Sequence, residues 1–540
     1  MKNLVFLYAG KNSTHAFDKV FSENSAFGRC LMWAGAIPGC LGIVIMSSTE
    51  NQDAVKEQLG EVAVSNARII VKDSWLCSDI VETMAVECAA AKADNAVYTT
   101  ADRPFMDSWL TNEVLECHEK YIAEYTFADG YPYGFAPEVI HGGTLNILNT
   151  FAKETHRELA QVPVSNECIF NLLKADINSF EIEAVIAPKD YRMLRFDFSC
   201  GIKRNLLACQ RLYGLAMEKD IAFNAKKLAD LAEQSAEVQQ TLPAFYNVQI
   251  CQNMSSLPLY SPYPEAYKSK FGKLPVVSEN SEAQSMSLEK FNGLVSQISD
   301  FSEDAVVGLS GFAEPLLEKN ICAYIDSVLQ NKNLSVLIET DGTLVTPELA
   351  ENIAAVVAKH GPRNTGEKSI IWIVSLDAAT EAMHSTIVKG GTFTASLASI
   401  TILEKSFPGC VYPQLTRMNE NESELEQFYR FWHDKNSPSK GRLIIQKYDD
   451  CCKTLPARKP ADLSPLERNV CWHLKRDMTI LWDGSVPLCR QFLLSSSIGN
   501  AFEEGIEKIW GNTLETVKDH LAANFSEKCR DCDEYYTFNF

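Results

Sequence analysis

Two cysteine pairs, Cys471-x12-Gly484-x4-Cys489 and Cys529-x2-Cys532, decide how the last part of this chain must fold. The two residues inside the second pair let one turn direct both thiolates to the same inorganic centre. Gly484 permits the positive φ or close backbone approach that a hairpin needs to bring its two cysteines together. We therefore expect one metal or iron–sulfur site on the four thiols; two unrelated pairs of buried thiols are the alternative.

The length and charge of the chain limit how many domains it has and which partners it can bind. Its 540 residues exceed what one hydrophobic core usually organises, so we expect about two to four globular domains. Fifty Lys and Arg residues stand against seventy Asp and Glu residues, which gives a formal net charge of −20. Because this charge repels phosphate backbones and anionic lipids, neither nucleic acid nor a membrane is expected as a partner.

The cysteine usage indicates a reducing, cytoplasmic location. Seventeen cysteines lie mostly as single residues, unlike the dense disulfide framework of a small secreted domain. The N-terminal apolar run is only roughly seven residues long and lacks a cleavage site, so it predicts a buried strand rather than a signal peptide. Glycines and a proline break the apolar segment 30–46, which is also too short to span a bilayer comfortably.

Residues 1–205 alternate short apolar runs with amphipathic segments such as 81–93. The runs lie at 3–8, 42–46, 67–71, 96–99 and 182–186. This alternation predicts an α/β domain with a mostly parallel, doubly wound sheet, whose ligands bind beyond the carboxyl ends of the strands. Polar sequences follow two of the runs, Ala9-Gly10-Lys11-Asn12-Ser13 and Thr100-Ala101-Asp102-Arg103-Pro104-Phe105.

These two strand ends, with Tyr133-Gly134 and residues 137–140, resemble the nucleotidyltransferase fold of sugar-nucleotide cytidylyltransferases. The resemblance implies a nucleotide or sugar-nucleotide ligand and Mg²⁺ on Asp102, because a hard cation prefers carboxylate oxygen. The Gly-x-Gly-[Ser/Thr]-Arg loop of that family is missing, and Ser199 stands where a second metal carboxylate is expected. Asp197 would share a strand face with Ser199 and is the candidate substitute. The alternative for Asp102 is ordinary turn chemistry.

Two further segments follow. Apolar residues at helical spacing among Lys, Glu and Gln predict a helical connector at 206–243. Residues 244–442 then carry a second strand–helix series, which is typical of a full or partial parallel barrel. Its predicted strands are 245–251, 305–309, 334–339, 369–376, 411–417 and 443–446, with helices at 320–330 and 347–359 between them.

Three strand ends of this series resemble the radical SAM barrel: Leu309-Ser-Gly-Phe-Ala-Glu-Pro-Leu-Leu317, Glu339-Thr-Asp-Gly-Thr-Leu344 and Ser375-Leu-Asp-Ala378. The resemblance implies an S-adenosylmethionine site at Ala313, Glu314, Pro315, Ser375 and Asp377. A methyl group at Ala313, where that family has glycine, crowds the backbone approach and counts against binding of this cofactor.

The catalytic cluster of that family needs Cys-x3-Cys-x2-Cys after the first strand. Here Tyr260-Ser261-Pro262 matches the usual aromatic-Cys-Pro frame, which puts Met254, Pro258 and Ser261 at the three ligand positions. A thioether, a proline and a neutral serine are poor ligands for iron compared with thiolate. We therefore expect that the chain does not generate radicals by itself.

The cysteine region, 443–540, resembles the SPASM or twitch extension of radical SAM enzymes, and four cysteines supply the ligands of one auxiliary 4Fe-4S cluster. The chain as a whole resembles spirochaete-type SPASM proteins, through Asp462-Leu-Ser-Pro-Leu466, Ile480-Leu-Trp-Asp-Gly484 and the ending after Cys532. Cys451-Cys452 could add a ligand, although an inert pair is the simpler interpretation. His473, close to Cys471, is expected to support the site or the fold.

Three functions remain open at this point. The first is an iron–sulfur protein for electron relay, structural support or recognition of a peptide or protein partner. The second is a Mg²⁺-dependent nucleotidyltransferase that uses the N-terminal domain. The third is a radical SAM maturase with unorthodox cluster ligation. Zinc on the four thiolates is the alternative to a cluster.

Overall fold

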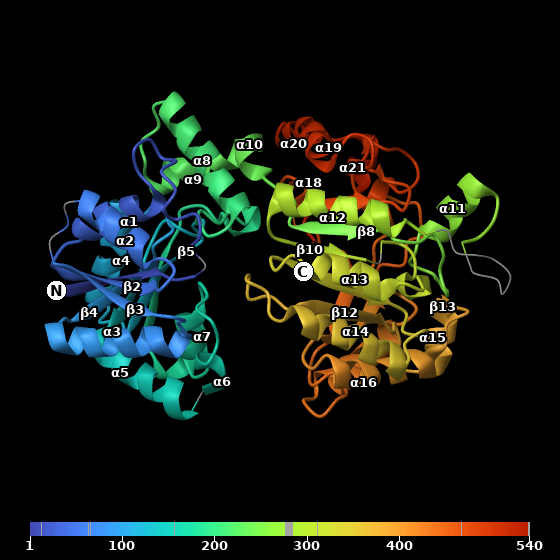
Figure 1. Ribbon diagram of the computed structural model, residues 1–540, viewed down its shortest axis with the longest axis horizontal. Helices are drawn as coiled ribbons and strands as arrows, with labels where there is room; N and C mark the ends of the chain where they lie inside the picture. The colour runs from blue at the N-terminus through green and yellow to red at the C-terminus, as the bar shows by residue number, and fades with distance from the viewer. Residues whose placement is uncertain are drawn as a thin grey trace. The chain divides into compact units, whose positions relative to one another are not determined.

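The computed structural model describes all residues except 12, 63, 65, 156, 276–284, 310, 466 and 538–540 (Figure 1). Asn12, Ser310, Leu466 and the last three residues of the aromatic tail, which belong to the motifs above, therefore lie outside the described residues. The chain divides into two compact units, Met1–Thr241 and Leu242–Phe540. Within the described part of the chain, no helix is both long and apolar enough to cross a membrane.

The first unit is built on a seven-stranded sheet of order β3-β2-β1-β4-β6-β5-β7. Strands β1 to β4 are parallel, β6 runs antiparallel to β4 and β5, and β7 is parallel to β5. The strands are β1 (Asn3–Ala9), β2 (Cys40–Ser48), β3 (Ala67–Lys72), β4 (Asn95–Thr100), β5 (Tyr125–Asp129), β6 (Glu138–His141) and β7 (Ile182–Ile186). The doubly wound α/β fold is confirmed, with one antiparallel strand that the apolar runs did not indicate.

Both faces of this sheet are covered because alternate residues of each strand point to opposite sides. Leu4, Phe6 and Tyr8 of β1 pack with α3, α5 and α7, whereas Val5 and Leu7 pack with α1, α2 and α4. The helices are α1 (Ala26–Gly35), α2 (Gln52–Glu61), α3 (Cys77–Ala91), α4 (Ser108–Lys120), α5 (Gly142–Thr150), α6 (Arg157–Ala160) and α7 (Cys168–Lys174), with short turns η1 (Phe151–Thr155), η2 (Ile177–Ser179) and η3 (Arg192–Leu194).

The predicted connector is helical, and it packs as part of the first unit. It forms α8 (Lys203–Glu218), α9 (Ala225–Glu233) and α10 (Ala236–Gln239). Their apolar faces enclose an aromatic cluster with Phe21, Phe105, Phe135 and Phe198.

The second unit is built on a seven-stranded parallel sheet of order β15-β14-β12-β11-β10-β8-β16, an open half-barrel. The strands are β8 (Phe245–Val248), β10 (Ala305–Gly308), β11 (Leu334–Thr340), β12 (Ile370–Ser375), β14 (Val411–Arg417), β15 (Ile444–Lys447) and β16 (Asp477–Ile480). Both edge strands, β15 and β16, come from the segment 443–540 that was predicted as the cysteine domain. The cysteine region and the half-barrel therefore share one sheet.

Helices cover the outer face of the half-barrel (Figure 1). Side chains that alternate outward, such as Val336, Ile338 and Trp372, pack under them, while Phe245, Leu337 and Ile373 form a small apolar layer inside. The main helices are α12 (Leu288–Ser302), α13 (Ile321–Leu329), α14 (Pro347–His360), α16 (Phe393–Ser406) and α17 (Leu425–His433).

Shorter elements complete the second unit, and α19 packs against α12 (Figure 1). Within the barrel these are β9 (Leu257–Pro258), α11 (Tyr263–Phe271), η4 (Pro315–Leu317), α15 (Glu381–Ile387), β13 (Val388–Lys389) and η5 (Glu422–Glu424). Around the cysteines they are α18 (Trp472–Arg476), β17 (Ser485–Val486), η6 (Arg490–Phe492), β18 (Gly499–Asn500), α19 (Ile506–Asn512), α20 (Leu514–Leu521) and α21 (Glu527–Asp531).

Candidate metal centre

The four cysteines come from three places in the second unit. Cys471 is the residue before α18, Cys489 is the residue before η6, and Cys529 and Cys532 lie in and just after α21. The β17–β18 hairpin follows Gly484, which has a φ of +86°. A side chain at Gly484 would collide with Phe502 and Asn500, so the close approach expected for this glycine is present.

The four thiols form one electrostatic group. Cys489 interacts with Cys471, Cys529 and Cys532, and Cys471 interacts with both thiols of the second pair. All four are free thiols, two of them buried and two half-buried. Burial raises the pKa of Cys471 to about 12 and holds the pKa of Cys489 well above its usual value. A bound cation must therefore supply the charge that stabilises the thiolates, as metals do at such sites.

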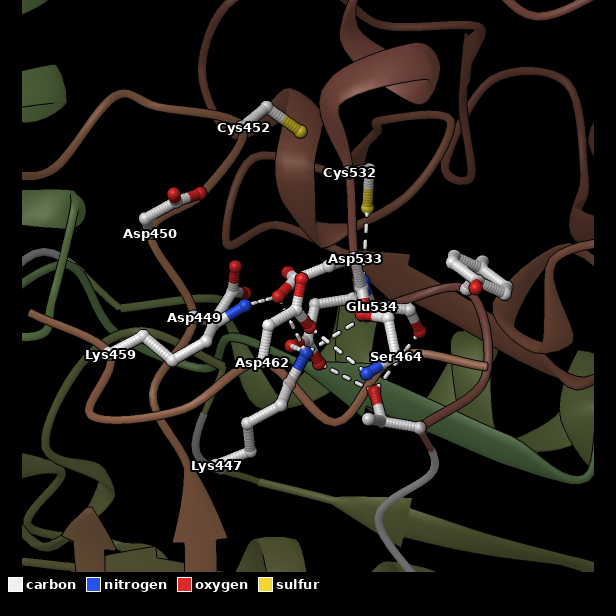
Figure 2. Close-up of polar contacts among 12 residues, drawn as sticks. Lys447, Asp449, Asp450, Cys452, Lys459, Asp462, Ser464, Cys532, Asp533 and Glu534 are labelled. Atoms are coloured by element: carbon white, nitrogen blue, oxygen red, sulfur yellow. Dashed lines mark hydrogen bonds and ion pairs between the residues drawn. The ribbon is translucent and has the colours of Figure 1, made fainter. Parts of the chain in front are cut away.

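An acidic trio lies beside Cys532, where oxygens of Asp449, Asp533 and Glu534 are within 4.8 Å of one another. Lys447 Nζ is 2.5 Å from Glu534 Oε1 and 3.2 Å from Asp533 Oδ2, and Lys459 also pairs with Asp533. Figure 2 shows both lysines directed at the trio. Two ammonium groups already neutralise these carboxylates. We therefore interpret the ion pairs of the trio as structural contacts that hold the turn at Cys532 against the end of β15.

A polar cavity of about 100 Å³ lies inside the half-barrel, next to the cysteines. Cys489 and Arg490 form part of its wall, together with Glu339, Lys447 and His473. Burial opposes the charge on Arg490, but Asp449, Cys451, Glu534 and Glu339 outweigh it, so its pKa lies above the usual value. His473 is held by Asp477 through a 2.6 Å contact of its Nδ1, which fits the supporting role that we expected.

A second cavity of about 120 Å³ lies at the carboxyl ends of the strands. Met254, Pro258 and Ser261, the three positions where a radical SAM cluster needs cysteines, all line it. Its lining, within the described residues, includes no cysteine. Cys251 lies deeper, where its thiol donates to the carbonyl of Glu314 at 3.1 Å. The two cavities share Tyr260, Gly311, Glu339 and Arg490.

The predicted S-adenosylmethionine residues divide into two groups. Ala313, Glu314 and Ser375 line the second cavity, whereas Pro315 and Asp377 are buried and do not line it. The Asp377 carboxylate instead accepts hydrogen bonds from the Tyr260 hydroxyl at 2.8 Å and from the Thr416 backbone N–H at 2.8 Å.

Glu314 is held as a structural carboxyl group. It accepts from the Thr340 hydroxyl at 2.8 Å and from the backbone N–H groups of Asp341 and Leu316 at 3.0 and 3.1 Å. Burial and the nearby Asp341 raise its pKa to about 8. This side chain fixes the segment after β10 to the end of β11.

In the first unit the structure brings Asp102 and Asp197 together. Asp102 is buried and Asp197 is half-buried, and burial raises the pKa of each; Asp102 also contributes to raising that of Asp197 to about 6. Asp102 accepts from the Thr100 hydroxyl at 2.5 Å, and the Asn205 amide donates to Asp197 at 2.9 Å. Two neighbouring carboxyl groups offer the oxygen ligands that a divalent cation prefers, and such a cation would offset the cost of ionising both.

Arginine and lysine side chains of this unit that could bind a phosphate already contact other groups of the protein. The Arg103 guanidinium lies 4.0 Å from the ring centroid of Tyr133 and donates to Thr100. Lys11 pairs with Glu50 at 3.2 Å, and Lys19 with Glu61 at 2.6 Å. Both lysines of residues 11–19 therefore pair with carboxylates of the protein itself.

Comparison with known proteins agrees with this geometry. The SPASM family, described as an iron-sulfur cluster-binding domain, matches residues 471–533, which include all four cysteines. An uncharacterized protein of Treponema pallidum (strain Nichols) is 38% identical over 379 residues, which cover 69% of this chain and 98% of the relative. A second uncharacterized protein of that organism is 31% identical over 138 residues, 24% of this chain and 63% of the relative.

Solved structures similar to parts of the chain include a cytidylyltransferase from Leptospira borgpetersenii (15% identity, 44% of this chain, 96% of that chain, TM-score 0.36). They also include BtrN in complex with AdoMet and 2-DOIA (15% identity, 54% of this chain, 94% of that chain, TM-score 0.33). A third is anSMEcpe with bound AdoMet (12% identity, 54% of this chain, 87% of that chain, TM-score 0.37). The fold and the cysteine region thus define an α/β protein that carries a SPASM iron–sulfur domain. The chain belongs to the same family as the larger Treponema pallidum relative.

Proposed function

We propose that this chain is an iron–sulfur protein of radical SAM and SPASM architecture that lacks the catalytic cluster and holds one auxiliary 4Fe-4S cluster. Cys471, Cys489, Cys529 and Cys532 would be the ligands. The observation that carries the proposal is the gathering of these four free thiols, inside the matched SPASM segment, around one buried space.

The spacing of the thiols supports a cluster over zinc. Tetrahedral zinc at 2.3 Å from each sulfur requires thiolates only about 3.8 Å apart. Among the described residues, no three of the four cysteines place their sulfurs within 4.8 Å of one another. A core of several irons holds its ligands farther apart than a single ion does, so it fits this arrangement better.

A cluster at this place would supply one-electron redox chemistry to the protein. The chain's own residues suggest where that would matter: Cys489 and the adjacent Arg490 both line the polar barrel cavity. We propose that the cluster orders this segment and presents the Arg490 guanidinium to a small polar ligand or a peptide side chain. A cytoplasmic location would keep the seventeen free thiols of the chain reduced.

Anaerobic reconstitution tests the cluster directly. We expect about four irons and four sulfides per chain, with charge-transfer absorption, and loss of both in the Cys529→Ala/Cys532→Ala variant. Cys410→Ala, which changes a half-buried thiol directly before β14, should retain the full iron content. Stoichiometric zinc without sulfide would contradict the proposal.

The cavity lined by Met254, Pro258 and Ser261 supports the absence of radical chemistry. None of these side chains offers a thiolate to iron, so we expect no 5′-deoxyadenosine after reduction with S-adenosylmethionine. Detection of that product by mass spectrometry would instead favour a maturase with unorthodox cluster ligation.

A second candidate function, Mg²⁺-dependent nucleotidyl transfer, is favoured by the Asp102–Asp197 pair. If the pair binds Mg²⁺, a nucleotide with Mg²⁺ should raise the melting temperature by mass action. CTP, UTP and GTP should be compared, with Asp102→Asn and Asp197→Asn as variants that lose the effect. No shift with any nucleotide would argue against this activity.

A further inference from the structure

Two side chains of opposite charge, Arg490 and Glu339, line both cavities of the second unit. Both are half-buried; Arg490 begins η6, and Glu339 is the residue before the last of β11. They interact electrostatically, yet within the described part of the chain no ion pair joins them. The cavities therefore contain a positive and a negative group that do not neutralise each other directly.

The Arg490 guanidinium keeps its donors free of protein acceptors. Among the described residues, none accepts a hydrogen bond from it, and none pairs with it within 4.0 Å. Its ring contact is with Phe312, whose centroid lies 5.8 Å from the guanidinium carbon. A guanidinium presents its N–H groups as a planar fork that matches a carboxylate in two parallel hydrogen bonds. Arg490 is therefore suited to bind a carboxylate ligand.

The Glu339 carboxylate has one neutral donor. Its Oε1 accepts from the Gln414 side-chain amide at 3.2 Å, and no described lysine, arginine or histidine pairs with it. An ionised carboxylate offers two oxygens with several acceptor positions, so most of its capacity is unused. An ammonium group would supply both the missing charge and the missing donors.

The other charged side chains of the polar cavity have partners inside the protein. Lys447 pairs with Glu534 at 2.5 Å, His473 contacts Asp477 at 2.6 Å, and Asp449 accepts two hydrogen bonds. Among the charged residues that line the polar cavity, Arg490 and Glu339 thus retain the most capacity to bind a ligand.

We propose that the polar cavity binds a small α-amino acid as a zwitterion, with its carboxylate on Arg490 and its ammonium group on Glu339. The inference rests on the proposed function, in which the cluster presents Arg490 to a ligand, and it names the class of that ligand. An inorganic anion would be repelled by Glu339, and a simple cation would be repelled by Arg490. A zwitterion is attracted by both.

The size of the cavity limits the side chain of this amino acid. An apolar cavity of roughly 150 Å³ holds one benzene molecule. The polar cavity measures about 100 Å³, so it has room for glycine or alanine, whereas leucine would exceed it. Phe245, Leu337 and Ile373 also line this cavity, and they supply an apolar surface for the carbon atoms of the ligand.

Thermal unfolding and isothermal titration calorimetry of the full-length, anaerobically reconstituted protein test the proposal. Glycine and alanine should raise the melting temperature by mass action and bind at one site per chain. Glycinamide lacks the carboxylate, and N-acetylglycine lacks the ammonium group. Because each leaves one protein charge without its partner, each should bind at least about tenfold more weakly than glycine.

Two variants assign the two charges. Glu339→Gln should weaken glycine and reduce its advantage over N-acetylglycine, since the partner of the ammonium group loses its charge. Arg490→Lys keeps the charge but loses the planar fork, so it should weaken glycine and reduce its advantage over glycinamide. Glu348→Gln is the matched control, because Glu348 is exposed at the start of α14 and lines neither cavity. Iron content is measured for every variant.

The outcomes separate this inference from the cluster. Reconstituted protein that takes up iron but binds neither glycine nor alanine would overturn the amino-acid site and leave the cluster intact. Protein that binds glycine without taking up iron would support the site and overturn the cluster. Equal affinities for glycine, glycinamide and N-acetylglycine, or tighter binding of inorganic phosphate, would show that the cavity does not recognise a zwitterion.

Discussion

Two places in the second unit of this protein differ in the side chains that they gather. At the carboxyl ends of the strands, Met254, Pro258 and Ser261 surround a cavity without thiols. At the C-terminal segment, four free thiols interact with one another. The comparison teaches that hydrogen bonds hold the segments at the ends of the strands in place where no thiol lines the cavity.

Those other contacts are specific at the site without thiols. The hydroxyls of Ser255 and Ser256 donate to Asp341 at 2.5 and 2.8 Å, which fixes the loop after β8 to the end of β11. Glu314 fixes the next segment to the same strand end. At the cysteine site, by contrast, ion pairs of Lys447 with Asp533 and Glu534 hold the turn at Cys532.

The largest effect is expected from restoring the missing thiols. Because Met254, Pro258 and Ser261 all line one cavity, the Met254→Cys/Pro258→Cys/Ser261→Cys variant should bind a second cluster. Iron content should rise from about four to about eight per chain after reconstitution. If the iron content stays at the wild-type level, the cavity has lost more than its ligands.

The next effect is a pH dependence of stability at the site without thiols. The pKa of Glu314 is about 8 in the folded protein against an ordinary value of 4.5. Its contribution is fully present below about pH 4.5 and is lost as the pH rises through about 8, because the unfolded chain then releases the proton that the folded chain retains. The loss is on the order of 5 kcal/mol as an upper bound.

Glu314→Gln keeps the shape of the protonated side chain without its titration. Urea unfolding at pH 5, 7 and 9 should therefore show a weaker pH dependence in this variant than in the wild type, with the variant the more stable at pH 9. Parallel pH profiles for the two proteins would mean that Glu314 ionises normally in the folded state.

A smaller effect is expected at the cysteine site from Gly484→Ala. The alanine would adopt a φ of +86° and collide with Phe502 and Asn500, which should cost about 1–3 kcal/mol. Gly511→Ala is the control, since no atom lies within 4 Å of the added methyl group in helix α19. Equal melting temperatures for the two variants would show that the hairpin tolerates rearrangement.

Many of the strands and helices could be predicted from the sequence, because apolar runs and helical spacing are visible within a few neighbouring residues. The positions of strands β1 to β4, β7, β8, β10, β11, β12, β14 and β15 came from such runs, and Met254, Pro258 and Ser261 came from the Tyr260-Ser261-Pro262 frame. Strand β6 was not predicted, because its four residues carry only Val139 and Ile140 as a buried pair. The pairing of β16 with β8 joins distant parts of the chain, and no local pattern encodes it.

The candidate sites were predicted less completely. The left-handed turn at Cys451 and Cys452 was not predicted, because it lacks the glycine or asparagine that would have indicated it. Arg490 was missed, although its place directly after Cys489 was the available signal. Asp377 was predicted at a cofactor site, but a buried aspartate and a ligand-facing one look alike in the sequence.

The pairing of β16 with β8 also determines when, during synthesis, the sheet of the half-barrel can be completed. Phe245 pairs with Asp477 and Val248 with Ile480. The first strand of the half-barrel therefore lacks one neighbour until the chain through Ile480 has left the ribosome. An unpaired strand edge is a site of aggregation during synthesis. The four cysteines, which lie on both sides of β16, would then meet only after Cys532 has been synthesised, and we expect truncation before residue 477 to yield insoluble protein rather than a stable half-barrel.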